Sequence, residues 1–289
     1  MLIMEEIMNI KEITELKIHA ANVRKMALEA VFSAGSGHPG GSLSIADILT
    51  YLYLKELKIS PTDAKNKDRD RFVLSKGHCS PALYGVLAEA GFIPKEDIKT
   101  FRQAQSYLQG HPDKKGVNGV DMSTGSLGQG ISAACGMALA AKLDNKDYRV
   151  YAAVGDGECE EGQVWESAMF AAHYKLDNLT VFLDFNGLQI DGDIREVMNP
   201  TPFDEKFMAF GWNVIEIDAH NFNQIEKAIE DAKTVKDKPT LVLAKSIKGK
   251  GVSFMENQAK WHGAAPNKEQ YEQAIEELDS YISDLGGEL

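Results

Sequence analysis

Apolar residues follow two different spacings along this chain. At steps of three or four they predict an amphipathic helix over residues 13–33, where Leu16, Ala20, Val23 and Ala27 share one face. Short continuous apolar runs predict strands that are buried on both sides. These runs are residues 71–75, 149–154, 179–184, 213–217 and 240–246.

Helix-like segments separate most of these strands. We expect helices over residues 80–90, 127–143, 163–175 and 223–235, and a closing helix from Asn267. The tetrapeptide SIAD at 44–47 resembles a capping box that opens a further helix reaching about Leu57. The alternation predicts an α/β fold with a mainly parallel sheet and helices on both faces. Residues 1–289 contain no internal repeat or long linker, so we expect a single domain.

Composition narrows the class of protein. The formal net charge of -12 argues against a nucleic-acid-binding surface. Cys79, Cys135 and Cys159 form no C-x-x-C pair, and three scattered cysteines suit a reducing cytoplasm. The apolar run at 131–141 is too short to span a bilayer, and the acidic first residues do not resemble a secretory signal. We therefore expect a cytoplasmic protein that binds no membrane.

The tripeptide GDG at residues 155–157 follows one predicted strand, and Asn186 follows the next. Ligands of parallel α/β sheets bind beyond the carboxyl ends of the strands, so both side chains should meet there. Carboxylate and amide oxygens suit Mg²⁺, or alternatively Ca²⁺ or Mn²⁺. One carboxylate cannot neutralise a dication, so a diphosphate would complete the site. The alternative is that GDG and Asn186-Gly187 are simple turns.

Several predicted loops contain further candidate functional residues. Residues 185–205 form a long polar segment, and long irregular segments in compact domains are often functional. Four of the seven histidines lie in loops beside glycine or proline, which predicts a shared polar pocket, whereas His19, His173 and His220 match no motif. The four are His38, His78, His111 and His262.

Seven segments in order resemble the cofactor-binding region of the transketolase family, which uses thiamine diphosphate. They include GDG followed after 28 residues by Asn186, which is similar to the thiamine diphosphate signature. The seven are SAGSGHPGGSLS (33–44), DRFVLSKGHCSPALY (70–84), GHPD (110–113), STGSLGQGIS (123–132), GDGECEEGQVWE (155–166), DFNGLQIDG (184–192) and KGKGVSFMENQAKWHG (248–263).

The resemblance implies a thiamine diphosphate-binding fold and roles for individual residues. The metal, Mg²⁺ or another divalent cation, would be held by Asp156, Asn186 and the carbonyl of Leu188. His38, His111 and His262 would bind the sugar's oxygens and move protons. The coenzyme itself would contact His78, Gly125, Ser126, Leu127, Gly157, Asn186 and His262, and Ser126 departs from the proline usual in the family.

Several charged residues near these motifs have two interpretations. Glu158 and Glu160 are expected simply to favour the dipole of the helix that follows, and Glu161 either does the same or matches a family glutamate at a dimer contact. Lys248 and Lys250 either close a loop over phosphate or are merely solvated. Cys159 has no partner base nearby in sequence, and we expect it to be inert.

The resemblance also implies an incomplete enzyme. In the family, the glutamate that activates the coenzyme lies on a second, pyrimidine-binding domain downstream of the matched region. We therefore expect the N-terminal subunit of a split transketolase, with a separate C-terminal subunit supplying that glutamate in a heterotetramer. The reaction would move a two-carbon ketol unit from a ketose phosphate to an aldose phosphate in the pentose phosphate pathway.

Other functions stay open at this point. A deoxyxylulose-phosphate synthase or an α-keto-acid dehydrogenase subunit would use the same coenzyme, although the histidines favour a sugar phosphate. A nicotinamide dehydrogenase would place its glycine-rich turn after a first strand, whereas this chain begins with a helix and its GSLGQG at 125–130 has the wrong glycine order. A non-catalytic binding subunit is the third alternative.

Overall fold

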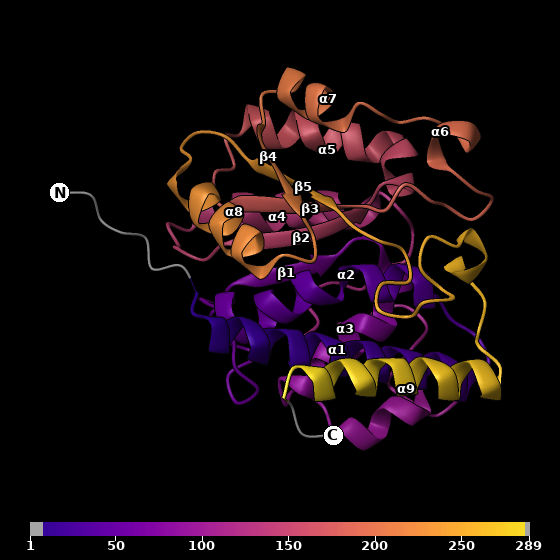
Figure 1. The fold of residues 1–289 in the computed structure, drawn as a ribbon. Helices are drawn as coiled ribbons and strands as arrows, with labels where there is room; N and C mark the ends of the chain where they lie inside the picture. Colours follow the sequence, from indigo (N-terminus) through magenta and orange to yellow (C-terminus); the bar gives the residue numbers. More distant parts are fainter. Residues whose placement is uncertain (1–7, 287–289) are drawn as a thin grey trace.

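The computed structural model describes residues 8–286 and contains one five-stranded parallel sheet. The strand order is β1-β2-β3-β5-β4, and every neighbouring pair is parallel, as predicted (Figure 1). The strands are β1 (Arg71–Leu74), β2 (Val150–Gly155), β3 (Leu179–Phe185), β4 (Asn213–Asp218) and β5 (Thr240–Lys245).

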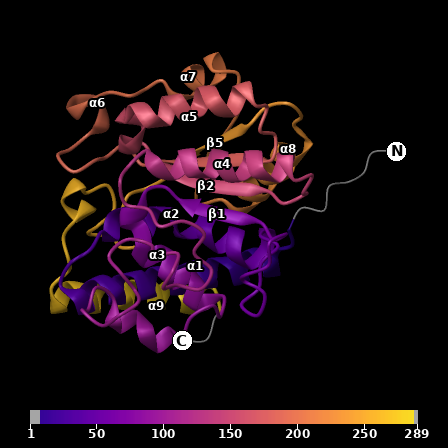
Figure 2. The same cartoon turned by 180° about the vertical axis from the view of Figure 1, so that it is seen from behind.

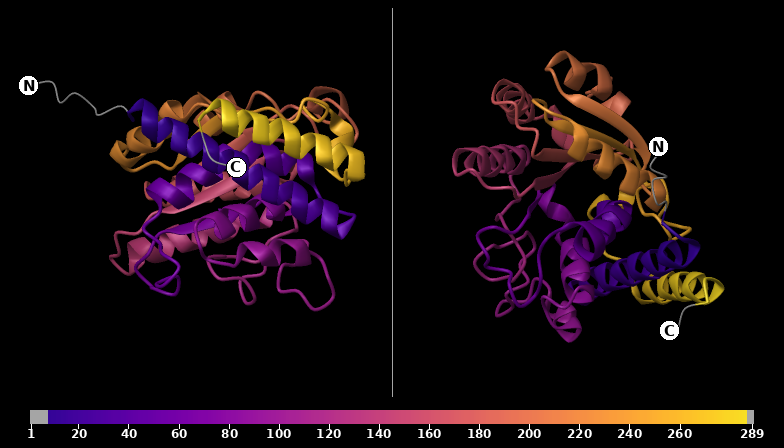
Figure 3. Two further views of the ribbon diagram at one scale, coloured as in Figure 1. Left: turned by 60° about the horizontal axis from the view of Figure 1, so that its bottom comes forward. Right: turned by 90° about the vertical axis from the view of Figure 1, so that its left-hand side faces the viewer.

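Helices cover both faces of this sheet, which explains why the strands read as continuous apolar runs. In β2, Val150 and Ala152 enter one core, while Tyr151 and Ala153 enter the other. The first core lies under α4 (Gln129–Leu143), α5 (Gly162–His173) and α7 (Phe203–Ala209) (Figure 2). The second lies under α1 (Ile10–Ala34), α2 (Pro39–Tyr51), α3 (Ser80–Glu89) and α8 (Phe222–Thr234) (Figure 3).

A further helix, α9 (Lys268–Asp284), lies along the outside of α1 (Figure 1). Its inward residues Leu278 and Ile282 form a third core with Leu28 of α1 and with Val252 and Trp261. The last two belong to the long segment after β5, so α9 holds that segment against the body of the protein.

Two local expectations were wrong. Helix α2 begins at Pro39, five residues before Ser44, because proline is well suited to the first helical turn and the following glycines permit close packing. A Cβ on Gly41 would lie 2.8 Å from the Sγ of Cys79. The helix then continues as a π-helical turn, Leu52–Glu56. The expected irregular segment 185–205 contains the short helix α6 (Ile194–Val197).

The carboxyl ends of the central strands meet at one edge of the sheet. Gly155 of β2 pairs with Asp184 of β3, so Asp156 and Asn186 leave adjacent strands near the same point. Short 3₁₀ helices follow there, namely Gly77–Cys79, Gly157–Glu160 and, after β5, Ala259–His262; a fourth, Lys95–Thr100, follows α3. None of the helices within residues 8–286 is both long and apolar enough to cross a membrane.

Candidate active site

A cavity of about 240 Å³ lies at the carboxyl ends of β1, β2 and β3. Segments from six parts of the chain converge on it, which explains why the motifs are dispersed in the sequence. Its lining includes His38, Gly41, Lys76, His78, Gly125, Leu127, Gly155, Asp156, Gly157, Glu158, Asn186, Leu188, Gln189, Ile190, Lys248 and His262.

Asp156 and Asn186 share this cavity, as the strand order predicted. One carboxylate oxygen of Asp156 accepts from the backbone N–H of Gly157 at 2.9 Å, and the other accepts from Gly187 at 2.6 Å. Burial, with the charge of Asp184 next, raises the pKa of Asp156 to about 6. A divalent cation beside it would favour the ionised form.

The carbonyl of Leu188 lies in the same loop as Asn186, whose amide oxygen accepts from the N–H of Leu188 at 3.1 Å. That carbonyl already accepts from the Nζ of Lys248 at 3.0 Å, and its second lone pair stays available for a cation. Residues 8–286 hold no cluster of three His, Cys, Asp or Glu side chains suited to a metal. A metal at Asp156 would therefore depend on the Asn186 amide, the Leu188 carbonyl and ligand oxygens.

Three of the four loop histidines, His38, His78 and His262, line the cavity together, and His111 lies beside them. The ring centroids of His38, His78 and His262 lie 5.2–5.4 Å apart. His111 lies further out, with its ring 6.4 Å from that of His38, and its side chain is exposed. The buried Nδ1 of His38 has no hydrogen-bond partner among the described residues, which leaves a polar atom for a ligand.

Burial and nearby cations favour the neutral form of the histidines at the cavity. Burial, followed by the nearby charge of Lys248, lowers the pKa of His262 to about 3. Burial, followed by the charge of Arg102, lowers the pKa of His38 to about 4. Burial and then Lys76 depress the pKa of His78. A neutral imidazole can donate one hydrogen bond and accept another, which suits a ligand rich in hydroxyl groups.

Lys76 is a functional candidate that the sequence interpretation missed. It lies two residues after the end of β1, is 1% exposed, and forms an ion pair with Asp184. The Oγ of Ser44 donates to the same carboxylate at 2.6 Å, and Ser246 donates to its other oxygen. The charge of Asp184 raises the pKa of Lys76 despite its burial. Its position at a strand's carboxyl end was the available indication.

Lys248 resolves the choice left open by the sequence, because it is only 2% exposed and is not solvated. Its Nζ contacts the Leu188 carbonyl and lies 3.2 Å from the Nδ1 of His262. Within residues 8–286, no carboxylate lies within ion-pair distance of it. A buried cation held by neutral acceptors favours an anionic ligand, because burial of an uncompensated charge is costly. Lys250, by contrast, pairs with Glu256 near the surface.

His220, to which the sequence assigned no role, fixes the segment before Lys248. Its Nε2 accepts from the N–H of Ile247 at 3.0 Å, and its Nδ1 lies 2.7 Å from Asp47. Asp47 is in turn paired with the buried Arg24. This chain of contacts connects α1 and α2 to the loop that carries Lys248.

Glu158 was expected simply to favour the dipole of the helix that follows, and the structure shows in addition that its side chain is buried. It is 2% exposed and accepts from the N–H groups of Gly128 at 2.9 Å and Gly155 at 3.0 Å. The Oγ of Ser75 also donates to it. Glu158 therefore joins the ends of β1 and β2 to the loop before α4. Glu160 and Glu161 are exposed, and Cys159 is buried with a strongly raised pKa.

We predict that Glu158→Ala lowers the free energy of unfolding by about 3 kcal/mol, because two buried N–H groups and one hydroxyl lose their acceptor. Urea unfolding followed by circular dichroism measures this. Glu160→Ala is the control: it removes an exposed carboxylate from the same short helix and should change stability by less than about 0.5 kcal/mol. Equal effects of the two substitutions would contradict the assigned contacts.

Of the three residues 125–127 that were expected to contact the coenzyme, two line the cavity. Gly125 and Leu127 line it, whereas Ser126 is exposed and does not. Gly125 has φ +151°, and a Cβ there would lie 3.0 Å from the Cδ2 of His111. Glycine at this position therefore lets the loop approach that histidine.

The residues at the cavity fit a diphosphate and a divalent cation. Two buried ammonium groups, Lys76 and Lys248, accompany the neutral His78 and His262 as donors. Asp156, Asn186 and the Leu188 carbonyl supply oxygen ligands on the neighbouring strand ends. The free Nδ1 of His38 adds a further donor or acceptor.

The family model described as "Transketolase, thiamine diphosphate binding domain" matches residues 16–280. The chain belongs to the transketolase family. The matched residues include every residue that lines the cavity. The candidate active site therefore lies within the family's thiamine diphosphate-binding domain.

Two transketolase relatives match this chain over nearly their whole length. A 6-deoxy-6-sulfo-D-fructose transketolase subunit of Clostridium sp. (strain MSTE9) is 46% identical over 262 residues, covering 90% of this chain and 95% of the relative. An apulose-4-phosphate transketolase subunit of Phocaeicola vulgatus is 42% identical over 274 residues, covering 95% of this chain and 97% of the relative.

Solved transketolase structures share the fold. The transketolase of Leishmania mexicana superposes with a TM-score of 0.84 at 30% sequence identity. The match covers 94% of this chain and 45% of the Leishmania transketolase, so this chain spans less than half of that protein. The expectation of a thiamine diphosphate-binding α/β fold is confirmed.

Proposed function

We propose that this chain is the diphosphate-binding subunit of a two-chain transketolase. It would transfer a two-carbon ketol unit from a ketose to an aldose with thiamine diphosphate and Mg²⁺. The observation that carries the proposal is the buried ammonium of Lys248, which has no carboxylate partner in the described part of the chain and lines one cavity with Asp156 and Asn186.

Different residues of this chain would bind the diphosphate, the cation and the sugar. Lys76, Lys248 and His78 would bind the diphosphate oxygens, and Asp156, Asn186 and the Leu188 carbonyl would hold the cation. Bound thiamine diphosphate would supply an acidic thiazolium carbon as the nucleophile. His38 and His262 would orient the sugar hydroxyls and move protons, and His111 would do so from the rim.

A partner chain is proposed because the site is too small to enclose the whole coenzyme. The cavity of about 240 Å³ lies below the range of about 300–1,000 Å³ typical of pockets that bury drug-sized ligands. Large apolar side chains are exposed on α4, on α5 and in the segment after β3, which is typical of interaction surfaces. They are Leu143 on α4, Met169 and the adjoining Tyr174 on α5, and Ile190 and Met198 in the following loops. The partner would cover them and supply the activating glutamate.

The substrate class is proposed from the relatives and from charge. Relatives of this chain are named for a sulfonated ketose and for a phosphorylated sugar, both of which are anionic. We propose a ketose with a terminal anionic group as the donor. The pentose phosphates are the first candidates to test, followed by sulfonated and branched sugars.

The test mixes the purified chain with its candidate partner subunit, thiamine diphosphate and Mg²⁺, and measures ketol transfer from xylulose 5-phosphate and from a panel of other ketoses. We expect turnover only when both chains are present. Activity of this chain alone would refute the two-chain proposal. Absence of ketol transfer from every ketose, despite formation of a complex that binds thiamine diphosphate, would refute the transketolase assignment.

We predict that His111→Ala lowers kcat/KM for ketol transfer by about a hundredfold or more, the range for removing a group that assists proton transfer. Its exposed position at the rim should leave the affinity for thiamine diphosphate within about twofold. Steady-state kinetics and calorimetry of the two-chain complex measure the two effects. His173→Ala, at an exposed position on α5, is the matched control. Equal losses in transfer and in coenzyme affinity would move His111 to the coenzyme site.

A further inference from the structure

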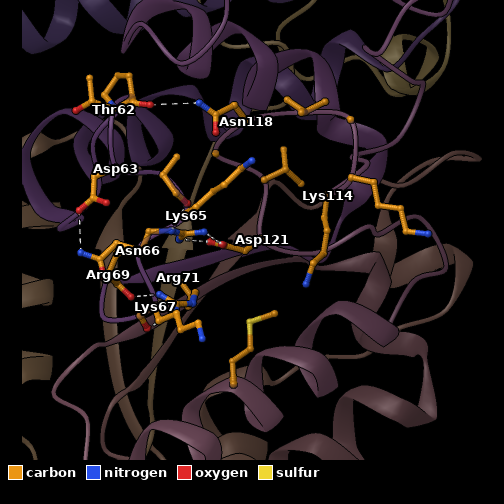
Figure 4. A pocket seen from close by; sticks show the side chains of 18 residues that line it. Thr62, Asp63, Lys65, Asn66, Lys67, Arg69, Arg71, Lys114, Asn118 and Asp121 are labelled. Carbon is orange, nitrogen blue, oxygen red and sulfur yellow. Dashed lines mark hydrogen bonds and ion pairs between the residues drawn. The ribbon is translucent and has the colours of Figure 1, made fainter.

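A second, larger cavity lies at the amino end of β1, at the opposite end of that strand from Lys76. Its volume is about 840 Å³, and it is lined by residues of the 61–71 and 114–121 segments and by Met137 of α4 (Figure 4). None of its lining residues lines the candidate active site. We call it the basic groove.

The basic groove concentrates positive charge on an acidic chain. Six cationic side chains and two carboxylates line it, an excess of four positive charges, although the whole chain has a net charge of -12. The six are Lys65, Lys67, Arg69, Arg71, Lys114 and Lys115.

Of the two carboxylates, only Asp63 is left to offset the charge of the lysines. Asp121 is occupied by an ion pair with Arg69 and by the N–H of Phe72, which donates to it at 2.8 Å. Asp63 accepts from the Nδ2 of Asn66 at 2.8 Å. Both carboxylates therefore stabilise the walls of the groove.

The four lysines of the groove are exposed and lack ion pairs with the described residues. Elsewhere on the surface, lysines commonly have a carboxylate partner: Lys142 pairs with Asp177 at 2.6 Å and Lys245 with Glu216 at 2.5 Å. In Figure 4 the side chains of Lys65, Lys67 and Lys114 surround the same space. Like charges brought together without counter-charges raise the local positive potential.

Two arginines make the frame of the groove rigid. Arg69 donates to the carbonyl of Ala64 at 2.6 Å, and Arg71 donates to that of Lys67 at 2.6 Å. The guanidinium of Arg71 also stacks on the ring of Tyr148, 4.5 Å from its centroid. The backbone that carries Lys65 and Lys67 is thereby fixed before any ligand binds, which lowers the entropic cost of binding.

We propose that the basic groove binds a compact polyphosphate, a small molecule with two or more phosphoryl groups. Its volume falls within the usual range for small-molecule sites. A long polyanion such as nucleic acid would also meet the negative surface of the rest of the chain, whereas a compact ligand meets only the local positive potential. Asn66, Asn118 and Thr62 line the groove and add uncharged hydrogen-bonding groups. This site is independent of the proposed transketolase function.

The test titrates inorganic tripolyphosphate, and separately ATP, into the full chain by calorimetry with EDTA present. The groove variant, Lys65→Ser with Lys67→Ser and Lys114→Ser, should weaken binding by at least about tenfold, because each charge acts at short range. The control variant, Lys17→Ser with Lys236→Ser and Lys238→Ser, removes the same charge outside the groove and should change affinity by less than about twofold.

Tighter binding of ATP than of tripolyphosphate would identify a nucleotide as the source of the phosphates. Equal binding of the two probes would assign the affinity to the phosphate chain alone.

A second measurement on the unaltered chain avoids reliance on how the variants fold. Reductive methylation followed by mass spectrometry should show that tripolyphosphate protects Lys65, Lys67 and Lys114 but leaves Lys17, Lys236 and Lys238 reactive. Binding of thiamine diphosphate with Mg²⁺ should be unchanged in the groove variant, which separates the two sites. The proposal is overturned by the absence of binding, by protection confined to Lys76 and Lys248, or by binding of an octaglutamate peptide but of neither phosphate probe.

Discussion

Replacing Asp156 by alanine should weaken Mg²⁺-dependent binding of thiamine diphosphate by at least about a hundredfold, or roughly 3 kcal/mol. Asp156 is the one carboxylate among the three proposed cation ligands, so its loss leaves only neutral oxygens for a dication. Calorimetric titration of thiamine diphosphate into the two-chain complex, with and without Mg²⁺, measures the effect.

Glu160→Ala is the matched control for this result. Glu160 is an exposed acid four residues further along, where it accepts from Gln189 at 2.9 Å, and its loss should leave coenzyme affinity within about twofold. Near-UV circular dichroism should show that the Asp156→Ala chain stays folded, although the N–H groups of Gly157 and Gly187 lose their acceptor. Unchanged coenzyme affinity in the Asp156 variant would refute the metal assignment.

Replacing Lys76 by methionine should lower the free energy of unfolding by about 3–5 kcal/mol, the usual result of removing one member of a buried ion pair. Asp184 is fully buried and would keep a charge whose neighbours are then only the hydroxyls of Ser44 and Ser246. Urea unfolding measures the shift in midpoint.

Two further substitutions separate charge from packing in this result. The double variant Lys76→Met with Asp184→Asn should recover part of the lost stability, because no uncompensated charge stays buried. Lys245→Met breaks the exposed pair with Glu216 and should cost less than about 1 kcal/mol. If Lys76→Met were no more destabilising than Lys245→Met, the buried pair would not be a stabilising element.

The strands and most of the site could be predicted from sequence because their causes are local. Each strand is buried on both faces, so β2 and β3 are recognisable as apolar runs, and parallel pairing brings Asp156 and Asn186 to one edge. The histidines were found through the glycines and prolines beside them.

The buried charges were missed because burial depends on partners far away in sequence. Lys76 and Asp184 are 108 residues apart, and the Glu158 carboxylate meets a hydroxyl 83 residues away. Charge alone gives no indication of such pairing. The start of α2 was misplaced for the same reason, because the missing side chains of Gly40 and Gly41 make room for Trp261 and Cys79, which are distant in sequence.

The position of α9 also bears on how this protein matures in the cell. The loop bearing Lys248 and His262 is held down through Val252 and Trp261, which pack on a helix formed by residues 268–284. During translation, that helix leaves the ribosome after every other segment that builds the pocket. The loop that carries Lys248 and His262 therefore has no packing surface on α9 until residues 268–284 have been made.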